Sequence, residues 1–365
     1  VFGALTFALS TYLIIILGVG HNTKALAIGY APIIIAGVYK VLDKKYLPGF
    51  ILASIGLGLQ IGANHYQMTY YFMMMIGLLF LIDLIFEIKN KSFNFKKIGV
   101  FIGAFFLAIS LNSTSILATK EYTDFSTRGK SEITINPDGT DKKNTNGLSK
   151  EYITEYSYGI TESLNLLIPR FTGGGSGDMV DKEGDFFKSL QNYDSDTARI
   201  IYQNSRLYWG NQPIVEAPAY IGISVFFLFI LGFTFLSKIQ KIWIISSIAF
   251  ALTLSWGKNF PYLADLFIDY FPFYDKFRAV SSIQVIIEFL IPLVAAIGVY
   301  NFFEGDSKKI NEKKLLTTTA AFIIPLLILY FVGDSVFSFK SNFEVFAEYP
   351  EILNDLVKER ITVFK

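Results

Sequence analysis

Cysteine is absent from this chain, and histidine occurs only twice in 365 residues. Without cysteine there is no disulfide framework, no thiol nucleophile and no thiolate metal site. Two histidines are too few for a histidine-rich metal centre. The sequence also lacks HExxH, GxSxG, Walker and EF-hand patterns, which excludes those signatures of catalysis or ion binding. A net charge of +1 gives no indication of a nucleic-acid partner.

Long hydrophobic runs dominate what is present, and 52% of the residues are hydrophobic. An apolar segment of roughly 17–25 residues is long enough to cross a bilayer as a helix. We therefore predict an all-α polytopic membrane protein with about nine transmembrane helices. The predicted spans are Phe2–Val19, Ala25–Leu42, Pro48–Ala63, Met68–Phe86, Ile98–Ala118, Ala217–Leu236, Ile242–Trp256, Val280–Phe303 and Leu315–Val332.

Lysines alternate along the gaps between these spans, and this alternation predicts the orientation. Twelve lysines lie in the gaps Asp43–Tyr46, Glu87–Lys97, Ser237–Lys241 and Glu304–Lys314. The alternate short gaps, His21–Lys24, Asn64–Gln67 and Gly257–Arg278, hold four Lys or Arg. Because short Lys/Arg-rich loops stay in the cytoplasm, we expect a multi-pass protein of the bacterial inner (cytoplasmic) membrane. The loop 119–216 and the tail after Asp334 are then outside.

This orientation divides the chain into four regions. Residues 1–118 carry five predicted spans, and residues 119–216 form a large external (periplasmic) loop. Residues 217–333 carry four more spans, with an aromatic external hairpin at 257–278, and residues 334–365 begin an external C-terminal region. The large loop contains a predicted turn at 136–139 and a solvated tip at 141–146.

Two stretches of the large loop show helical spacing of apolar residues. Ser149, Tyr152 and Tyr156 form one, and Thr161–Ile168 forms the other. We expect short amphipathic helices that lie along the membrane surface, with the apolar side down.

Small residues and prolines predict how the spans pack. Gly49, Ala53, Gly56, Gly58 and Gly62 would let helix backbones approach closely in lipid. The prolines at positions 32, 292 and 325 are expected to kink their helices, which neighbouring helices can tolerate.

The two histidines lie in very short loops that are predicted to open on the same external face. One loop contains His21 and Asn22, and the other contains His65 and Gln67. Such loops favour a polar site at the membrane surface, although His and Asn also cap helix ends and meet lipid headgroups.

External cations border the same region. Lys24, Lys258 and Arg278 lie next to spans, and Arg128 and Arg170 lie in the large loop. Each is a candidate ligand for a lipid phosphate, or an anchor for headgroups. Tyr156 and Trp209 are further candidates in the loop.

Carboxylates at membrane depth are costly unless they are paired. Asp83 and Glu87 lie near the cytoplasmic end of their span, where we expect them to snorkel. Glu288 lies well inside its span and is expected to face a polar cavity or a partner. Six external acids are candidate bases that the sequence does not rank: Glu121, Asp124, Glu155, Glu162, Asp178 and Asp265.

Several blocks of this sequence resemble the YfhO family of bacterial membrane proteins, in the form common in Bacteroidota. The blocks are Gly20–Lys24, Asn64–Tyr71, Glu151–Thr154, Tyr156–Gly159, Leu167–Pro169, Tyr208–Gly210, Leu254–Asn259 and Tyr274–Ser281. They follow family order over nearly the whole chain. The family is similar to the GT-C glycosyltransferases, which transfer a sugar from a polyprenyl-phosphate carrier to an acceptor on the outer face.

The resemblance implies a GT-C-like fold, a polyprenyl-phosphate-linked sugar as donor, and a cell-envelope glycan or polymer as acceptor. GT-C enzymes hold their catalytic acid in the first external loop. Because this chain begins inside an apolar run without an initiator Met, we expect a fragment whose catalytic carboxylate lies upstream. A divalent metal is compatible with this chemistry, and no metal site can be identified from the sequence. A transporter or flippase for a lipid-linked sugar and a non-catalytic envelope assembly protein are the alternatives.

Overall fold

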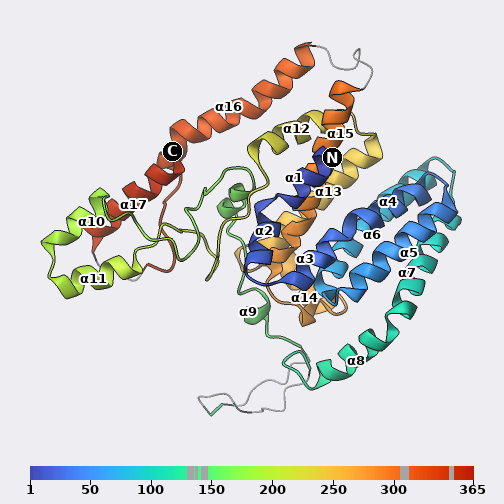
Figure 1. Ribbon diagram of the computed structural model, residues 1–365, viewed down its shortest axis with the longest axis horizontal. Coiled ribbons are helices and arrows are strands. Elements are labelled where there is room, and N and C mark those ends of the chain that lie inside the picture. Colours follow the sequence, from blue (N-terminus) through green and yellow to red (C-terminus); the bar gives the residue numbers. More distant parts are fainter. Residues whose placement is uncertain (130–134, 136–138, 141–146, 305–311, 345–348) are drawn as a thin grey trace. The chain divides into compact units, whose positions relative to one another are not determined.

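The computed structural model describes the chain except for residues 130–134, 136–138, 141–146, 305–311 and 345–348, and the Lys314 side chain. The predicted turn at 136–139 lies mostly outside the described residues, and the predicted tip at 141–146 lies wholly outside them. The chain forms two compact units (Figure 1). Unit 1 comprises Val1–Ile15, Tyr158–Leu236 and Glu288–Lys365, and unit 2 comprises Ile16–Ser157 and Ser237–Ile287.

Unit 2 is a bundle of apolar helices in which α4, α5 and α6 lie side by side and α7 packs on α5 (Figure 1). Its helices are α3 (Asn22–Gly29), α4 (Ala31–Leu42), α5 (Tyr46–Gly62), α6 (Tyr66–Lys89), α7 (Phe95–Leu111), α8 (Ser113–Asp124), α9 (Lys150–Ile153), α13 (Lys238–Ser255) and α14 (Pro261–Tyr270). Three 3₁₀ helices complete it: η3 (Gly257–Asn259), η4 (Tyr274–Lys276) and η5 (Val280–Gln284).

Unit 1 combines apolar helices with the second half of the large loop and the C-terminal region. Its elements are α1 (Phe2–Ala8), η1 (Thr161–Leu166), α10 (Asp185–Ser189), η2 (Leu190–Asn192), α11 (Ser195–Asn204), α12 (Ile223–Phe233), α16 (Glu312–Val336) and α17 (Pro350–Phe364). Helix α2 (Thr11–Gly18) begins in unit 1, and α15 (Val285–Phe303) ends in it. The large loop is therefore divided between the two units after Ser157.

Four helical segments are long and apolar enough to cross a membrane, or five if the bent pair α7–α8 counts as one span. The four are Asn22–Leu42, Tyr66–Lys89, Val280–Phe303 and Leu315–Val336. Helices α5 and α12 are apolar but shorter. The described residues thus form a helical protein with the character of a membrane protein, with fewer full-length spans than the nine predicted.

Part of the shortfall comes from breaks that hydropathy does not reveal, and part comes from the short helices α5 and α12. The predicted span Phe2–Val19 is interrupted at Leu9–Ser10, between α1 and α2. The predicted span Ile98–Ala118 bends by 72° between α7 and α8. At that bend the Asn112 amide donates to the carbonyl of Gly58, 3.0 Å away. Pro32 lies in the first turn of α4, where a proline needs no kink, while Pro292 and Pro325 lie inside α15 and α16.

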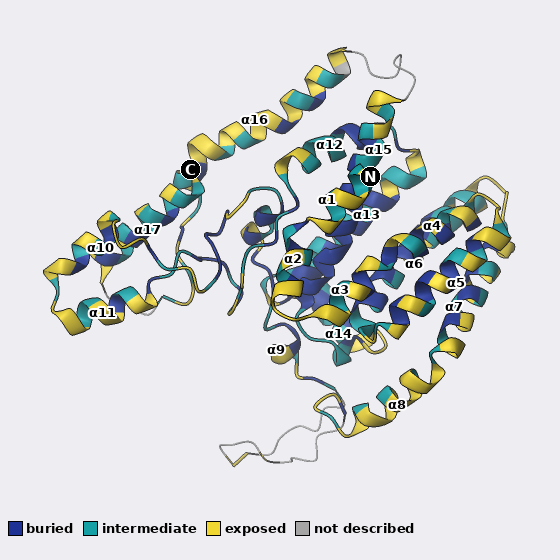
Figure 2. Cartoon of the chain, in the orientation of Figure 1, coloured by how far each residue is buried: buried dark blue, intermediate teal, exposed yellow. Residues whose placement is uncertain are grey.

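Small residues allow α4 and α5 to pack backbone to backbone. A Cβ added to Gly37 would lie 2.5 Å from the backbone nitrogen of Ala53. A Cβ on Gly49 would lie 2.8 Å from the nitrogen of Val41, and one on Gly56 would lie 2.9 Å from that of Ile34. Figure 2 shows the buried stripes of α4, α5 and α6 that result. Gly58, by contrast, has no heavy atom within 4 Å of such a Cβ.

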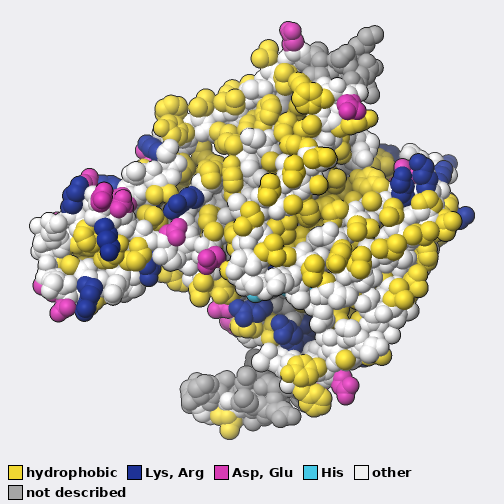
Figure 3. Space-filling view, in the orientation of Figure 1, with side chains coloured by type: hydrophobic (Ala, Val, Ile, Leu, Met, Phe, Trp, Pro, Cys, Tyr) yellow, Lys and Arg dark blue, Asp and Glu magenta, His cyan; other side chains and the backbone are white. Residues whose placement is uncertain are grey.

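Charged side chains near the C-terminal end of α6 form a largely buried cluster. Lys97 of α7 donates to Asp83 at 2.8 Å and lies 2.6 Å from Glu87. The expectation that these carboxylates snorkel to water is corrected, because Lys97 reaches in to pair with both. Other lysines gather at this end of the unit, where α4 joins α5 and α6 joins α7 (Figure 3).

The loop half of unit 1 has its own core, made with the C-terminal region. Phe171, Trp209 and Phe339 are buried together, and Leu164 and Ile168 pack against them. Leu164 and Ile168, which we expected to face the membrane, are partly buried against this aromatic core. Arg360 of α17 is 2% exposed and pairs with Glu344. The same guanidinium donates to the carbonyls of residues 206, 208 and 339.

Replacing Gly37 with Ala tests the α4–α5 contact. We expect a destabilisation on the order of 1–3 kcal/mol, because the new methyl group meets backbone that cannot move aside. Gly58→Ala is the matched control, and it should be neutral or slightly stabilising because its surroundings are open and Ala favours helix. Thermal unfolding in detergent measures both; equal melting temperatures for the two variants would contradict this packing.

Candidate functional site

Two helices of unit 2 begin at the same end, which we call the histidine end. His21 precedes α3 and His65 precedes α6. Each helix start follows a residue with a left-handed backbone, Gly20 at φ 82° and Asn64 at φ 58°. Glycine and asparagine are the residues that adopt this conformation most easily, which explains these tight connections. Neither histidine accepts a capping hydrogen bond from its own helix.

His65 lies half-buried in positive surroundings. Burial, and to a smaller extent the nearby charges of Lys24 and His21, lower its pKa from 6.5 to about 4. The imidazole is therefore neutral at pH 7, with one nitrogen able to donate a hydrogen bond and the other able to accept one. Its Nδ1 is buried and has no hydrogen-bond partner among the described residues. An incoming ligand could supply that partner.

Lys24 and Gln67 connect the helix starts to the segment 278–282. The ammonium of Lys24 donates to the hydroxyl of Ser282 at 2.9 Å. The amide of Gln67 donates to the carbonyl of Arg278 at 2.7 Å and to the hydroxyl of Tyr71 at 2.9 Å. Three stretches that are far apart in sequence thus meet at the histidine end. Asn22 is the first residue of α3 and is exposed there.

Arg278 is held between two aromatic rings. Its guanidinium carbon lies 4.5 Å from the ring centre of Tyr152 and 5.4 Å from that of Tyr156. It also donates to the Tyr152 hydroxyl and lies 3.4 Å from a carboxylate oxygen of Glu155. Arg278 is therefore oriented and partly neutralised, while Lys24 is the cation whose charge acts on His65.

The backbone that presents Arg278 is strained. Phe273 and Ala279 have φ values of 65° and 58°. Such conformations cost of order 1–3 kcal/mol in residues other than glycine, and persist where surrounding contacts impose them. Here the amide of Ala279 donates to the carbonyl of Ile153 at 3.1 Å, and the amide of Ser281 donates to that of Tyr156 at 3.1 Å. The stretch 153–156 thus fixes the loop that carries Arg278.

The other predicted site residues make separate contacts. Lys258 is exposed in η3, and its backbone amide donates to the Ser157 hydroxyl at 3.1 Å. Arg128 donates to the carbonyl of Lys276, and Arg170 pairs with Asp178. Trp209 belongs to the core of unit 1. Glu288 also belongs to unit 1, where it is buried within α15.

The candidate bases differ in how far they are already engaged. Glu162 is 2% exposed and accepts from the hydroxyl of Tyr208, the amide nitrogens of residues 159 and 211, and the Gln212 side chain. A carboxylate with four donors is a structural anchor of the loop. Asp178, Asp265 and Glu155 pair with cations. Glu121 and Asp124 are exposed on α8.

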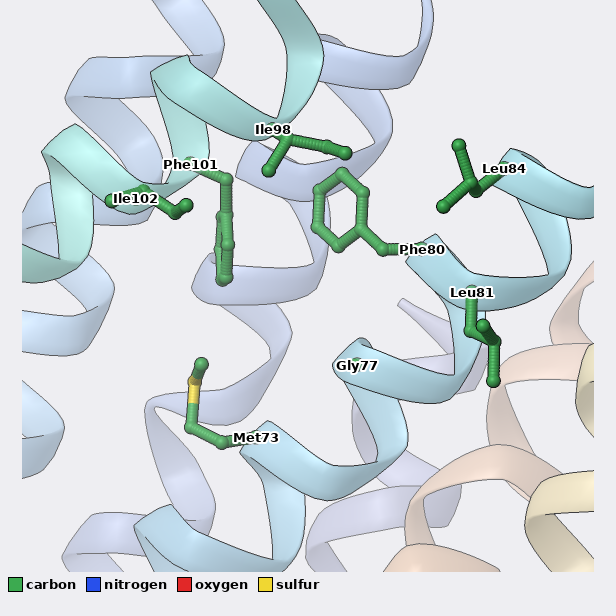
Figure 4. A pocket seen from close by; sticks show the side chains of 8 residues that line it. All are labelled: Met73, Gly77, Phe80, Leu81, Leu84, Ile98, Phe101 and Ile102. Atoms are coloured by element: carbon green, nitrogen blue, oxygen red, sulfur yellow. The ribbon is translucent and has the colours of Figure 1, made fainter. Parts of the chain in front are cut away.

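An apolar groove runs between α6 and α7 in the same unit (Figure 4). Its volume is about 200 Å³. The lining residues are Met73, Gly77, Phe80, Leu81, Leu84, Ile98, Phe101 and Ile102.

Sequence reasoning missed the role of Ser282 and the stacking of Tyr152 on Arg278. A hydroxyl pair at the start of an otherwise apolar span, Ser281-Ser282, is the signal that could have pointed to the first. The arrangement as a whole offers a cation, a neutral imidazole and two helix starts, which suits an anion. Among the described residues, no three His, Asp or Glu side chains are grouped as metal ligands would be. Comparison of the chain with protein-family models, curated proteins and solved structures gives no match.

The titration of His65 tests the proximity of Lys24. We expect Lys24→Gln to raise the His65 pKa from about 4, because a positive charge is removed. The pKa should stay below 6.5, since burial is the larger cause. Lys258→Gln is the matched control and should change little. Because the chain has two histidines, NMR of ¹³C-labelled histidine resolves both.

The same shift predicts the pH dependence of stability. The unfolded chain binds the proton of His65 more readily than the folded chain does. The contribution of neutral His65 to the free energy of unfolding is therefore complete above the unfolded pKa of 6.5, and it is lost as the pH falls towards 4. A His65 signal titrating near 6.5 in the folded protein would show that the site is open to water and that Lys24 is remote.

Proposed function

We propose that this chain belongs to a membrane glycosyltransferase that moves a sugar from a polyprenyl-phosphate donor to a cell-envelope acceptor on the outer face of the bacterial inner membrane. The observation that carries the proposal is the group formed by Lys24, His21 and His65 at the starts of two helices. The sequence resemblance to the YfhO family and its GT-C relatives supplies the reaction class.

The charges at the histidine end suit a lipid phosphate. Helix starts carry partial positive charge, and α3 and α6 both begin here without side-chain caps. Lys24 adds a full charge, and its bond to the Ser282 hydroxyl can be exchanged for one to a phosphate oxygen. His65 can donate one hydrogen bond as a neutral imidazole.

The groove between α6 and α7 suits the lipid tail of such a donor. Met73 lies six residues after Gln67 on α6, which at 1.5 Å per residue is about 9 Å further along the axis. The lining residues of α6 then continue for two to three more turns on one side of the helix. A phosphate held near Gln67 would thus place its hydrocarbon within reach of an apolar channel.

In this proposal the residues described here bind and orient the donor. Lys24 and the starts of α3 and α6 would stabilise the negative charge that develops on the leaving lipid phosphate. The segment 152–156, which holds Arg278, would shape the acceptor side.

A second candidate function comes from a different class. A transporter or flippase for a lipid-linked sugar would need ionisable groups inside the membrane and interrupted helices. Glu288 and the α1–α2 break in unit 1 are observations of that kind. In a non-catalytic assembly protein, neither Lys24 nor the groove would need to bind a polyprenyl phosphate specifically.

Single cysteines test the proposed orientation, since the natural chain has none. Cys in place of the exposed Ser195 should react with an impermeant maleimide in intact spheroplasts. Cys in place of the exposed Ser92 should react only after the membrane is opened, because it lies in a lysine-rich loop. The reverse labelling pattern would show that the protein has the opposite orientation, and the histidine end would then not lie on the external face.

Donor binding tests the site itself. The protein should bind a polyprenyl phosphate more tightly than the matching neutral alcohol. Lys24→Ala should weaken phosphate binding roughly tenfold or more, since one lost charged contact costs on the order of 1–3 kcal/mol. Arg278→Ala and Lys258→Ala should have smaller effects, because Arg278 already pairs with Glu155 and Lys258 is exposed.

Lys89→Ala, at the other end of α6, is the matched control and should bind like the wild type. The alcohol should bind all variants alike, because the groove is unchanged. If every variant binds the phosphate as the wild type does, the cations are headgroup anchors.

A further inference from the structure

Glu288 is a carboxylic acid enclosed in the apolar part of unit 1. It lies in the first turn of α15 and is 1% exposed. Neither of its carboxyl oxygens has a hydrogen-bond partner of standard geometry among the described residues. The hydroxyl of Ser10 interacts with this carboxyl group, and it is itself 1% exposed and equally without a hydrogen bond of standard geometry.

The elements around Glu288 offer no counter-charge. Helices α1 and α12 contain no charged residue, and Glu288 is the only one in α15. Phe7 of α1 packs edge-on against Phe289 with ring centres 5.6 Å apart. Glycines bring α12 close to α15, since a Cβ on Gly232 would lie 2.1 Å from the carbonyl oxygen of Val294. Glu288 therefore has no ion-pair partner within the described part of the chain.

Ser10 lies where the first helix is broken, and the break is fixed by contacts within unit 1. The backbone amide of Thr11 donates to the carbonyl of Tyr220 at 3.1 Å, and the amide of Tyr220 donates to the Thr11 hydroxyl at 2.6 Å. A helix interruption beside a buried acid is how membrane proteins commonly build an ion site. Two buried polar groups without partners, facing each other at such a break, are the observation that points to a ligand.

We propose that Glu288 is a reversible proton-binding site, with Ser10 as its hydrogen-bond partner. In the bound state the proton forms an O–H bond on one carboxyl oxygen, and the neutral acid shares a hydrogen bond with the Ser10 hydroxyl. In the released state the proton passes to water and leaves a carboxylate. Ionisation without a partner or counter-charge is costly in these surroundings, so the proton is retained around neutral pH.

A proton fits this site better than a metal cation does. Two side chains offer three oxygens, whereas a hard cation such as Ca²⁺ takes six to eight oxygen ligands. Intramembrane acids of this kind serve as proton relays. The proposal does not rest on the proposed donor site: Glu288 and Ser10 belong to unit 1, whereas Lys24 and His65 belong to unit 2.

Dicyclohexylcarbodiimide tests the proposal, since it reacts with protonated carboxyl groups in apolar surroundings. The acid adds across the carbodiimide, its proton moves to nitrogen, and rearrangement leaves a stable N-acylurea without loss of any atom. We expect Glu288 of the full chain in detergent to be modified at pH 6–7, as read by peptide mass spectrometry, and modification to fall as the pH rises. Glu162, buried but saturated with donors, is the internal control and should remain unmodified.

Glu288→Gln mimics the protonated state and supplies a second readout. The variant should melt like the wild type at pH 6. At high pH the wild type should become less stable than the variant, because only the wild type must then carry a buried charge. Absence of modification at every pH, with a stability difference that does not depend on pH, would overturn the proposal. Protection of Glu288 by Na⁺ at constant pH would likewise overturn it and indicate a metal-cation site.

Discussion

Inside its apolar helices this protein must satisfy polar groups from its own side chains, because hydrocarbon offers no hydrogen-bond partner. The contacts of unit 2 follow from this constraint. Lys97 reaches two carboxylates near one end of α6, and Gln60 in the last turn of α5 donates to the carbonyl of Ala27 at 2.8 Å. At the other end of α6, Gln67 and Lys24 bind the segment 278–282. Polar chemistry is thereby concentrated at helix ends.

The positions of most helices could be predicted from apolar length, but their interruptions could not. The run Phe2–Val19 is continuous in hydropathy, yet it breaks at Leu9–Ser10 because Thr11 bonds to a segment more than 200 residues away. The bend after Leu111 depends on the Asn112 amide, which bonds to a carbonyl of α5. Such contacts become visible only in three dimensions, whereas glycine spacing already indicated that α5 would pack closely.

The candidate site could likewise be predicted where it depends on the positions of helices, and not where it depends on long-range contacts. His21, Lys24 and His65 adjoin helix starts, so counting spans was enough to assign them to one end. The state of Arg278 could not be foreseen, because it depends on Tyr152, Glu155 and Tyr156, which come from a loop over a hundred residues earlier. Leu164 and Ile168 have helical spacing, but that pattern does not distinguish a membrane surface from an aromatic core.

The pairing of Arg360 with the loop has a consequence for the order of events during synthesis. Arg360 donates to the carbonyl of Arg206 across 154 residues, and Phe339 completes the core around Trp209. During translation residues 158–216 are made well before these partners exist. Their aromatic side chains therefore stay partly exposed while α12, α15 and α16 are synthesised and inserted. The core of residues 158–216 is therefore completed only when α17 has been made, and long-range closure of this kind is slow.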